Sequence, residues 1–224
     1  MDRVLSQPGT PVPVPTTFAS RSVHRLSMSL ILASGSEIRQ QLLTNARVPF
    51  EAIPARVDEA AIRAALQEEG APPRDIADAL AEAKARKQSN RHLDRLVLGC
   101  DQVLEIDGTI LSKPQTPNDA RAHLRRLSGT KHRLHSAVVG YEGGVPLWRH
   151  IGTVRLTMRA LSSAYIDEYV TRNWDSIRHS VGGYKIEEEG IRLFARIDGD
   201  HFAILGLPLL PLLSWLTVRG SLPA

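Results

Sequence analysis

The sequence predicts an α/β fold, with a mixed, partly antiparallel sheet flanked by helices. Apolar, strand-like runs alternate with amphipathic helical segments along the 224 residues, a pattern typical of a sheet covered by helices. Short glycine-containing turns join several of these runs directly, and such hairpins exclude a purely parallel sheet. No repeat and no linker interrupts residues 28–224, so we expect one domain there, with two lobes around a cleft.

The first strand and helix follow from an apolar run that gives way to helical periodicity. Leu30–Ala33 is predicted to be a buried strand, and Ser34 or Ser36 can cap the helix that follows. The core side of that helix is expected to be Ile38, Leu42 and Leu43. The next predicted elements are a strand over residues 49–55 and helices over residues 59–70 and 73–88, the last with an apolar side formed by Ile76, Leu80 and Ala83.

The rest of the chain alternates between hairpins and helices. An apolar strand over residues 95–106 turns at Asp107-Gly108 into a short strand, and Thr116 opens a helix that ends at Ser128-Gly129. The remaining predicted elements are a long hairpin over residues 132–161 turned at Glu142-Gly143-Gly144, a helix capped by Ser162, and a second hairpin over residues 190–206 turned at Asp198-Gly199-Asp200.

The composition is that of an ordinary globular protein and excludes several classes. Hydrophobic residues make up 42% and charged residues 23% of the chain. The net charge is +4, but half of it lies in residues 1–28, and no basic run with interleaved aromatic residues follows, so we expect no nucleic-acid partner. The single cysteine, Cys100, rules out an intramolecular disulfide and leaves the redox compartment open.

The most apolar segment, residues 202–218, does not have the pattern of a membrane span. It is shorter than the roughly 20 residues that a spanning helix needs, and Gly206, Pro208 and Pro211 interrupt it. We predict a buried strand, a turn and a closing helix in this segment, and no membrane partner.

Residues 1–27 are expected to be a disordered N-terminal extension. They are rich in Pro, Ser and Thr and lack apolar periodicity, and without an apolar stretch they are not a secretory signal. A start codon assigned upstream of Met28 and an organellar targeting segment both fit this composition. The sequence leaves these two explanations open.

The junction of the first strand and helix has the features of an anion site. Free backbone N–H groups and the positive end of the helix dipole meet at such a junction. Ser34, Gly35 and Ser36 are small enough to let a ligand approach, and Arg39 adds a fork of donors suited to phosphate. A capped helix without any ligand is the simpler alternative.

Asp101 places a carboxylate inside an apolar strand. Burying a carboxylate costs roughly several kcal/mol unless it is paired, hydrogen-bonded or bound to a metal. Asp101 is therefore a candidate general base or metal ligand, with a turn aspartate beside Gly99 as the structural alternative. Lys84 and Lys113 would ordinarily be surface lysines, and they gain interest only from the pattern that they join.

Taken together, the motifs of residues 28–218 resemble those of the Maf family of nucleotide pyrophosphatases. "LILASGSEIRQQLL" is similar to the Leu-Ala-Ser-x-Ser-Pro-x-Arg motif of that family, and "LAEAKA" resembles its Leu-Ala-x-x-Lys-Ala motif. "VLGCDQV" and "GTILSKP" resemble its Gly-x-Asp-[Thr/Gln]-Val and Gly-x-x-Leu-x-Lys-Pro motifs. Six or more motifs in the correct order, including "VPFEAIPARVDE" and the later "GYKIEEEG" block, are far more specific than any one of them.

The resemblance implies a reaction and a set of site residues. Family members hydrolyse a nucleoside triphosphate to the monophosphate and pyrophosphate with a divalent metal cation, Mg²⁺ or Mn²⁺. By position, Asp101 matches the catalytic aspartate, and Glu51 matches a recurrent strand glutamate. The residues that match the phosphate pocket are Ser34, Ser36, Arg39, Lys84 and Lys113.

Three positions bear on the base of the nucleotide. The branch of the family that prefers dTTP and UTP has Arg, Thr and Gln where this chain has Ile38, Gln102 and Glu187, and the 7-methyl-GTP branch has Trp, Gln and Glu. Two of the three positions therefore agree with the 7-methyl-GTP branch. Ile38 lacks the flat face that tryptophan would offer to a methylated, cationic purine. An ion pair between Glu187 and Lys185 or an arginine is the alternative to a role in base recognition.

The resemblance favours a cytoplasmic enzyme. Its expected partners are the nucleoside triphosphate substrate and a second copy of the chain in a homodimer. An inosine-triphosphate-type pyrophosphatase fits the opening motif less well. A nucleotide-binding regulator of septum formation without turnover is the alternative from a different functional class.

Overall fold

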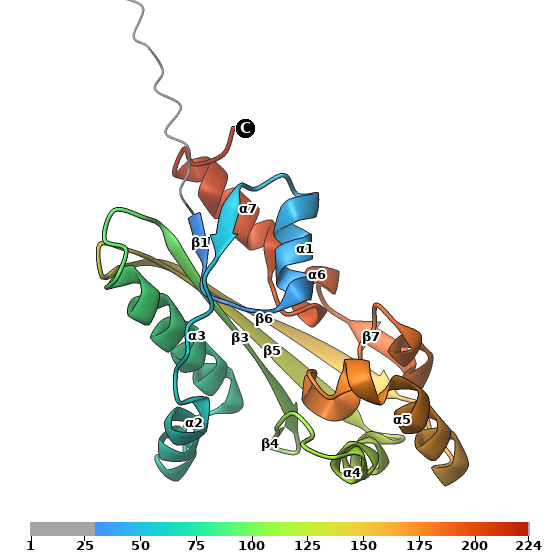
Figure 1. Ribbon diagram of the computed structural model, residues 1–224. Coiled ribbons are helices and arrows are strands. Elements are labelled where there is room, and N and C mark those ends of the chain that lie inside the picture. Colours follow the sequence, from blue (N-terminus) through green and yellow to red (C-terminus); the bar gives the residue numbers. More distant parts are fainter. Residues whose placement is uncertain (1–29, 224) are drawn as a thin grey trace, which may run out of the picture.

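The computed structural model describes residues 30–223, which form a seven-stranded open mixed sheet with helices on both faces (Figure 1). The strands are β1 (Leu30–Leu32), β2 (Phe50–Ala52), β3 (Val97–Ile106), β4 (Thr109–Leu111), β5 (Lys131–Glu142), β6 (Val145–Met158) and β7 (Phe194–Asp198). The helices are α1 (Glu37–Asn45), α2 (Glu59–Glu68), α3 (Pro73–Ser89), α4 (Pro117–Leu127), α5 (Ser163–Ile177), α6 (His201–Ile204) and α7 (Leu209–Val218), with 3-10 turns η1 (Val181–Gly183) and η2 (Glu189–Leu193).

The sheet has the order β2-β1-β3-β5-β6-β7, with β4 paired to β3. β1 runs parallel to β2 and β3, and every other pairing is antiparallel, which confirms the predicted mixed sheet. Positive φ angles at Asp107 and Gly108, and again at Gly143 and Gly144, build the two tight turns. Residues 1–27, expected to be a disordered extension, lie outside the described residues, and the two-lobed shape stays a prediction.

Each face of the sheet has its own apolar core. One face, with Ile31, Val97 and Val139, packs against α3, and the other packs against α1 and α4 to α7 (Figure 1). Such double covering requires strands that are apolar on both faces, as β1 and the first half of β3 are. No helix within residues 30–223 is long and apolar enough to cross a membrane.

α3 lies against β3 at Gly99. A Cβ atom at that position would lie 2.0 Å from the carbonyl oxygen of Ala81 and 2.5 Å from the backbone nitrogen of Ala85. Only glycine permits this approach. It brings Lys84, one helical position before Ala85, to the strand residue that follows Gly99 and Cys100.

Three local predictions were wrong. Ala83 is only half-buried, and the stripe of α3 that faces the sheet runs through Ile76 and Leu80 to Lys84 instead. Ser36 is the N-cap residue of α1, but neither serine side chain caps the helix. The predicted hairpin over residues 190–206 and the buried strand at the start of residues 202–218 are replaced by β7 followed by α6, because the Asp200 side chain accepts the N–H of Ala203 and begins a helix.

Candidate active site

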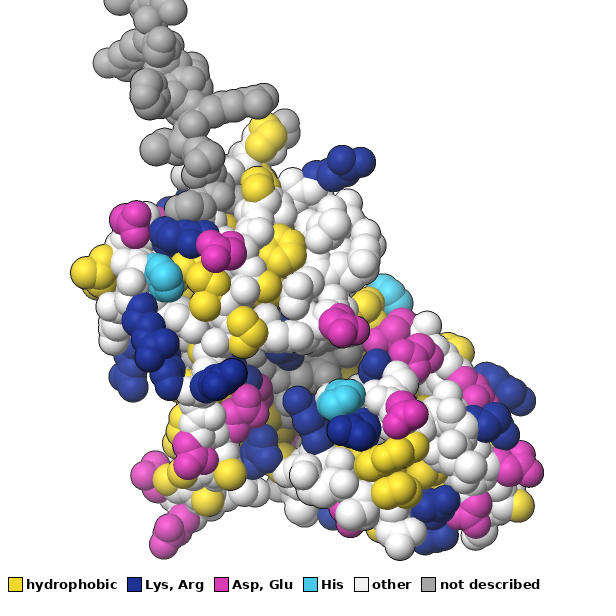
Figure 2. All heavy atoms as spheres, in the orientation of Figure 1, with side chains coloured by type: hydrophobic (Ala, Val, Ile, Leu, Met, Phe, Trp, Pro, Cys, Tyr) yellow, Lys and Arg dark blue, Asp and Glu magenta, His cyan; other side chains and the backbone are white. Residues whose placement is uncertain are grey.

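One cavity of about 720 Å³ brings together all nine residues predicted for the site. It is lined by residues from the end of β1, the start of α1, the middle of β3, the helices α2 and α3, and η1. Figure 2 shows a hollow in this face of the molecule, with Lys and Arg side chains beside it. The nine residues are Ser34, Ser36, Ile38, Arg39, Lys84, Asp101, Gln102, Lys113 and Glu187.

A buried ion-pair triad lies at the base of the cavity. The Nζ atom of Lys84 is 2.6 Å from Oδ1 of Asp101 and 2.7 Å from Oε1 of Glu59, and both Lys84 and Asp101 are more than nine-tenths buried. The second oxygen of Asp101, Oδ2, is buried and has no partner among the described residues. The carboxylate is thus fixed through one oxygen and leaves the other to accept a hydrogen bond or a cation from a ligand.

The charge of this triad is reflected in the pKa of Glu59. Burial alone would raise that pKa, but the charge and the hydrogen bond of Lys84 act in the opposite direction. Lys113 and Arg63 add further positive charge, and the pKa of Glu59 falls below its ordinary value as a result. The cavity is therefore electropositive enough at this point to keep Glu59 ionised.

Arg39 is held in place by three protein oxygens. Its Nε donates to the carbonyl of Gly206 at 2.7 Å, and Nη1 donates to Oγ of Ser34 at 3.1 Å and to the carbonyl of Cys100 at 3.2 Å. Gly206 has φ of +88°, and a Cβ atom there would lie 3.1 Å from Nη2 of Arg39. Ser34, Cys100 and Gly206 thus orient the guanidinium without neutralising it.

The start of α1 is left open to the cavity. The Ser36 side chain does not cap the helix. The first backbone N–H groups of α1 therefore receive no hydrogen-bond acceptor from it. The backbone N–H of Ser36 itself donates to Oγ of Ser34 at 3.3 Å. The buried Ser34 thus accepts hydrogen bonds from Arg39 and from the loop, and both Ser34 and Ser36 line the cavity.

Lys113 and Arg63 lie at the rim of the cavity. Lys113 is exposed and forms no ion pair within residues 30–223, but its charge reaches Glu59. Arg63, on α2, donates from Nη1 to Oγ of Ser112 at 2.9 Å, and its Nε is buried with no partner among the described residues. Both cations line the cavity, although Arg63 and the Ser112–Lys113 segment are about 50 positions apart in the chain.

The other end of the cavity contains the three positions expected to contact the base. The amide nitrogen of Gln102 donates to Oγ of Ser136 at 2.9 Å and to the carbonyl of Ile204 at 2.8 Å, so its Oε1 is the atom left for a ligand. Ile38 and Glu187 line the same end, which continues into a recess of about 50 Å³.

The alternative, an ion pair between Glu187 and Lys185 or an arginine, is wrong for the part of the chain that the structure describes. Lys185 pairs with Glu188 at 3.2 Å, and the exposed Glu187 forms no ion pair there.

Glu59 and Arg63 also line the cavity, and neither was predicted as a site residue. Glu59 was missed because the strand glutamate Glu51 was taken from the motif, yet Glu51 pairs with Arg95 and does not line the cavity. The Val-Asp-Glu segment of the same motif was the signal that could have identified Glu59. Arg63, one helical turn later, carries no motif, and only the packing of α2 shows that it belongs to the site.

No group of three or more His, Cys, Asp or Glu residues that could hold a metal ion exists among residues 30–223. The donor set instead fits a cation shared with a phosphate ligand, because Mg²⁺ is commonly bound by one or two carboxylates together with phosphate oxygens and water. The unpartnered Oδ2 of Asp101 and the nearby carboxylate of Glu59 have this character.

Fold and site together define an α/β protein with a cation-lined cavity at the strand-to-helix junction of a mixed sheet. Residues 29–218 match the family described as "Maf-like protein". The chain therefore belongs to the Maf-like protein family, which confirms the resemblance of its motifs.

Relatives match over nearly their whole length. A protein of Ruegeria pomeroyi named "Nucleoside triphosphate pyrophosphatase" is 63% identical over 195 residues, which cover 87% of this chain and 98% of that protein. A protein of Mesorhizobium japonicum named "7-methyl-GTP pyrophosphatase" is 47% identical over 197 residues, which cover 88% of this chain and 99% of that protein. The two names share a reaction class and differ in substrate.

Proposed function

We propose that this chain is a nucleoside triphosphate pyrophosphatase, which hydrolyses its substrate to the nucleoside monophosphate and pyrophosphate. The observation that carries the proposal is the carboxylate of Asp101, buried, fixed by Lys84 and left with one unpartnered oxygen in a cation-lined cavity. The names of the relatives support the same class of reaction.

The triphosphate is bound by the cations around the cavity. The start of α1 and Ser36 offer backbone and hydroxyl donors at one end, beside the oriented guanidinium of Arg39. Lys113 and Arg63 reach in from the opposite rim, where neither is engaged by a carboxylate within residues 30–223. Positive charge from several elements compensates the charge of the substrate without a single basic run in the sequence.

Asp101 acts as the general base. Its Oδ2 takes a proton from the water whose oxygen attacks the α-phosphorus, the bond from the α-phosphorus to the bridging oxygen breaks, and pyrophosphate leaves with the bridging oxygen and its electron pair. Lys84 fixes the carboxylate through Oδ1 and leaves Oδ2 without a partner among the described residues. The surrounding cations stabilise the charge that develops on the leaving group.

A divalent cation, Mg²⁺ or Mn²⁺, belongs to the proposal. Glu59, beside Asp101, is the residue that would hold it, together with phosphate oxygens of the substrate. When bound, the ion would spread the negative charge of the triphosphate.

The base is recognised by Gln102 and Glu187. Oε1 of Gln102 and the carboxylate of Glu187 are both acceptors, so they favour a base edge that presents N–H donors, as guanine does. A guanine-type nucleotide, with 7-methyl-GTP among the candidates, is therefore the proposed substrate. Ile38 contributes apolar contact in place of an aromatic stack.

Purified protein tests the reaction directly. We expect equal amounts of nucleoside monophosphate and pyrophosphate from a panel of canonical and modified triphosphates with Mg²⁺ or Mn²⁺, and no release after chelation. In ¹⁸O-labelled water the label should appear in the monophosphate. Tight nucleotide binding without any turnover would instead support a regulator that binds and does not hydrolyse. A homodimer and a cytoplasmic location stay predictions.

A further inference from the structure

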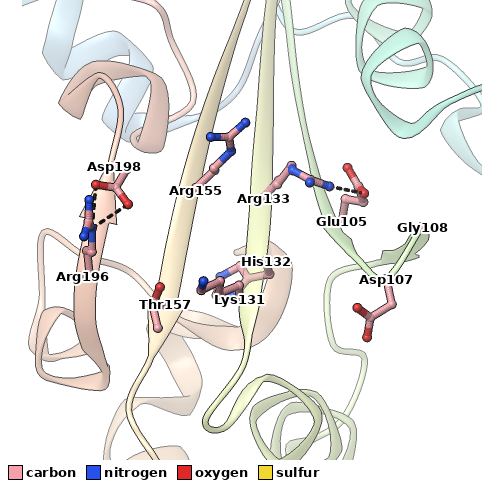
Figure 3. Close-up of a pocket in the computed structure, with 10 residues that line it drawn as sticks. All are labelled: Glu105, Asp107, Gly108, Lys131, His132, Arg133, Arg155, Thr157, Arg196 and Asp198. Carbon is pink, nitrogen blue, oxygen red and sulfur yellow. Dashed lines mark hydrogen bonds and ion pairs between the residues drawn. The ribbon is translucent and has the colours of Figure 1, made fainter.

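A second hollow, of about 520 Å³, lies on the sheet and shares no lining residue with the cavity described above (Figure 3). We call it the sheet hollow. It lies over β3, β5, β6 and β7, and nearly all of its lining side chains are polar or charged. They are Glu105, Asp107, Lys131, His132, Arg133, Arg155, Thr157, Arg196 and Asp198, with Gly108.

The strand register places two arginines side by side in this hollow. Glu105 on β3 is opposite Arg133 on β5, Arg133 is opposite Arg155 on β6, and Arg155 is opposite Asp198 on β7. Like charges directly opposite each other on neighbouring strands destabilise a sheet. The central Arg133–Arg155 pair is therefore unfavourable unless each arginine has a negatively charged partner.

The two carboxylates that end this row already have partners. Glu105 accepts from Arg133 at 2.8 Å and is 2.8 Å from the ring of His135, and Asp198 pairs with Arg196 at 2.8 Å through both of its oxygens. Figure 3 shows Glu105 directed to Arg133 and Asp198 directed to Arg196, with Arg155 between the two pairs. Among residues 30–223 no carboxylate lies within ion-pair distance of Arg155.

The next row of the sheet adds two more donors. Lys131 on β5 is opposite Thr157 on β6, and neither side chain has a hydrogen-bond partner within the described part of the chain. Asp107 lines the hollow as well, but it sits beside Gly108 at the far edge from Arg155 (Figure 3). The centre of the hollow thus offers a guanidinium, an ammonium and a hydroxyl that have no acceptor among residues 30–223.

We propose that the sheet hollow is a second anion site, which binds a ligand with two or more phosphate groups. Arg155 is its principal donor, with Lys131, Thr157 and the remaining N–H groups of Arg133 around it. Two phosphate groups match the two rows of donors, whereas a single one would satisfy only the arginine row. Free pyrophosphate and the phosphate tail of a nucleotide share this chemistry.

Titration of the whole protein with inorganic pyrophosphate, followed by amide NMR, tests the site. We expect shifts at Lys131, Arg155 and Thr157 that persist in a Lys113→Ala background, where binding in the nucleotide cavity is weakened. Arg155→Gln should raise the Kd for pyrophosphate that these shifts report by about tenfold to a hundredfold, which is the loss expected for charged hydrogen bonds. Arg155→Lys should retain part of the affinity, and Arg91→Gln, an exposed arginine outside the hollow, should change nothing.

A second titration, with a non-hydrolysable α,β-methylene nucleoside triphosphate, identifies the source of the phosphates. Tighter binding of pyrophosphate at the sheet hollow would identify the free anion, and tighter binding of the analogue would identify the nucleotide tail. Shifts confined to residues of the nucleotide cavity, or a Kd that Arg155→Gln leaves unchanged in a folded protein, would overturn the proposal.

Discussion

At the scale of single residues, the proposed chemistry depends on Asp101. Asp101→Asn keeps the volume of the side chain and removes its charge, so the variant should lose the base while Lys84 retains Glu59 as a partner. We expect turnover to fall by roughly 10²–10⁴-fold, the range typical of a general base. Steady-state kinetics measure the loss, and circular dichroism verifies the fold.

Asp175→Asn, at an exposed position on α5, is the matched control and should keep the native rate. Asp101→Glu should recover part of the activity, because the carboxylate is present but displaced. A near-native rate for Asp101→Asn would assign the proton transfer to another group.

Substrate choice is a second prediction at this scale. Glu187→Gln removes a charged acceptor from the base end of the cavity and should lower kcat/KM for GTP and 7-methyl-GTP by roughly tenfold, the worth of one charged hydrogen bond. UTP and dTTP should be affected less. Glu168→Gln is the control, because Glu168 is exposed on α5 and does not line the cavity. A preference for UTP that Glu187→Gln leaves unchanged would contradict the proposal that Glu187 recognises a guanine-type base.

Residue patterns anticipated the site well where a motif marked it. Asp101, Lys84 and Lys113 were assigned by motif order, and the fold places them in one cavity. Arg63 could not be assigned, since its place in the site comes from the docking of α2 and from no local pattern. Lys84 was recognised by its motif, yet its burial was not, because alanine at 83 looked like the more apolar continuation of the stripe.

At the scale of elements, the approach of α3 to β3 depends on Gly99. Gly99→Ala puts a methyl group 2.0 Å from a backbone oxygen of α3, where no flexible side chain can give way. We expect a loss of roughly 1–3 kcal/mol in the free energy of unfolding, the usual cost of overpacking, and a further loss of activity because Lys84 is displaced from Asp101.

Urea unfolding of Gly99→Ala measures the first effect and kinetics the second. Gly70→Ala is not a fair control, because its φ of +75° strains any side chain. Gly35→Ala is the better control for the unfolding measurement alone, since its Cβ would meet only Pro54 at 3.4 Å, but Gly35 lines the nucleotide cavity and does not serve as a kinetic control. If Gly99→Ala unfolds at the native midpoint, then α3 moves more easily than its packing implies.

The position of α2 is the second matter at this scale. No residue of this helix is buried, yet it carries Glu59 and Arg63 to the cavity. Arg63→Ala should raise KM by about tenfold to a hundredfold through a lost charged hydrogen bond to the triphosphate, with a smaller effect on kcat. Arg74→Ala, at an exposed position outside the cavity, should leave KM unchanged. An unaltered KM in Arg63→Ala would make Arg63 a structural contact of Ser112 alone.

Elements were predictable from the sequence where periodicity extended over several turns or strands. The long hairpin of β5 and β6 and the helices α2 and α3 follow their patterns closely. α6 was mistaken for a strand because its four residues are too few to show a helical period, and Asp200 signals a turn and a helix cap equally well.

At the scale of the whole molecule, stability should fall on mild acidification because of His132. Burial lowers the pKa of His132 to about 4 from its ordinary 6.5, and its Nε2 contacts the hydroxyl of Tyr184 at 2.8 Å. The unfolded chain therefore binds a proton that the folded chain does not, so the stability present above about pH 6.5 is lost as the pH falls towards about 4.

Urea unfolding between pH 7 and pH 4, comparing the wild type with His132→Gln, measures this effect. The variant should have a lower free energy of unfolding at pH 7. Over the window from pH 7 to pH 4 that free energy should fall by on the order of 3 kcal/mol less than in the wild type. Equal slopes would show that carboxylates elsewhere in the molecule account for the whole acid response.

The contacts of Arg39 also determine when, during synthesis of the chain from its N-terminus, the pocket can form. Its guanidinium is fixed by the carbonyl of Gly206, 167 positions later in the chain, and Gln102 is fixed by carbonyls of Ala203 and Ile204. A nascent chain still short of these residues carries every N-terminal motif without the groups that orient them. The pocket is therefore completed only after residues 203–206 have been synthesised, and a premature stop before residue 203 would leave a product with the N-terminal family motifs and no organised site.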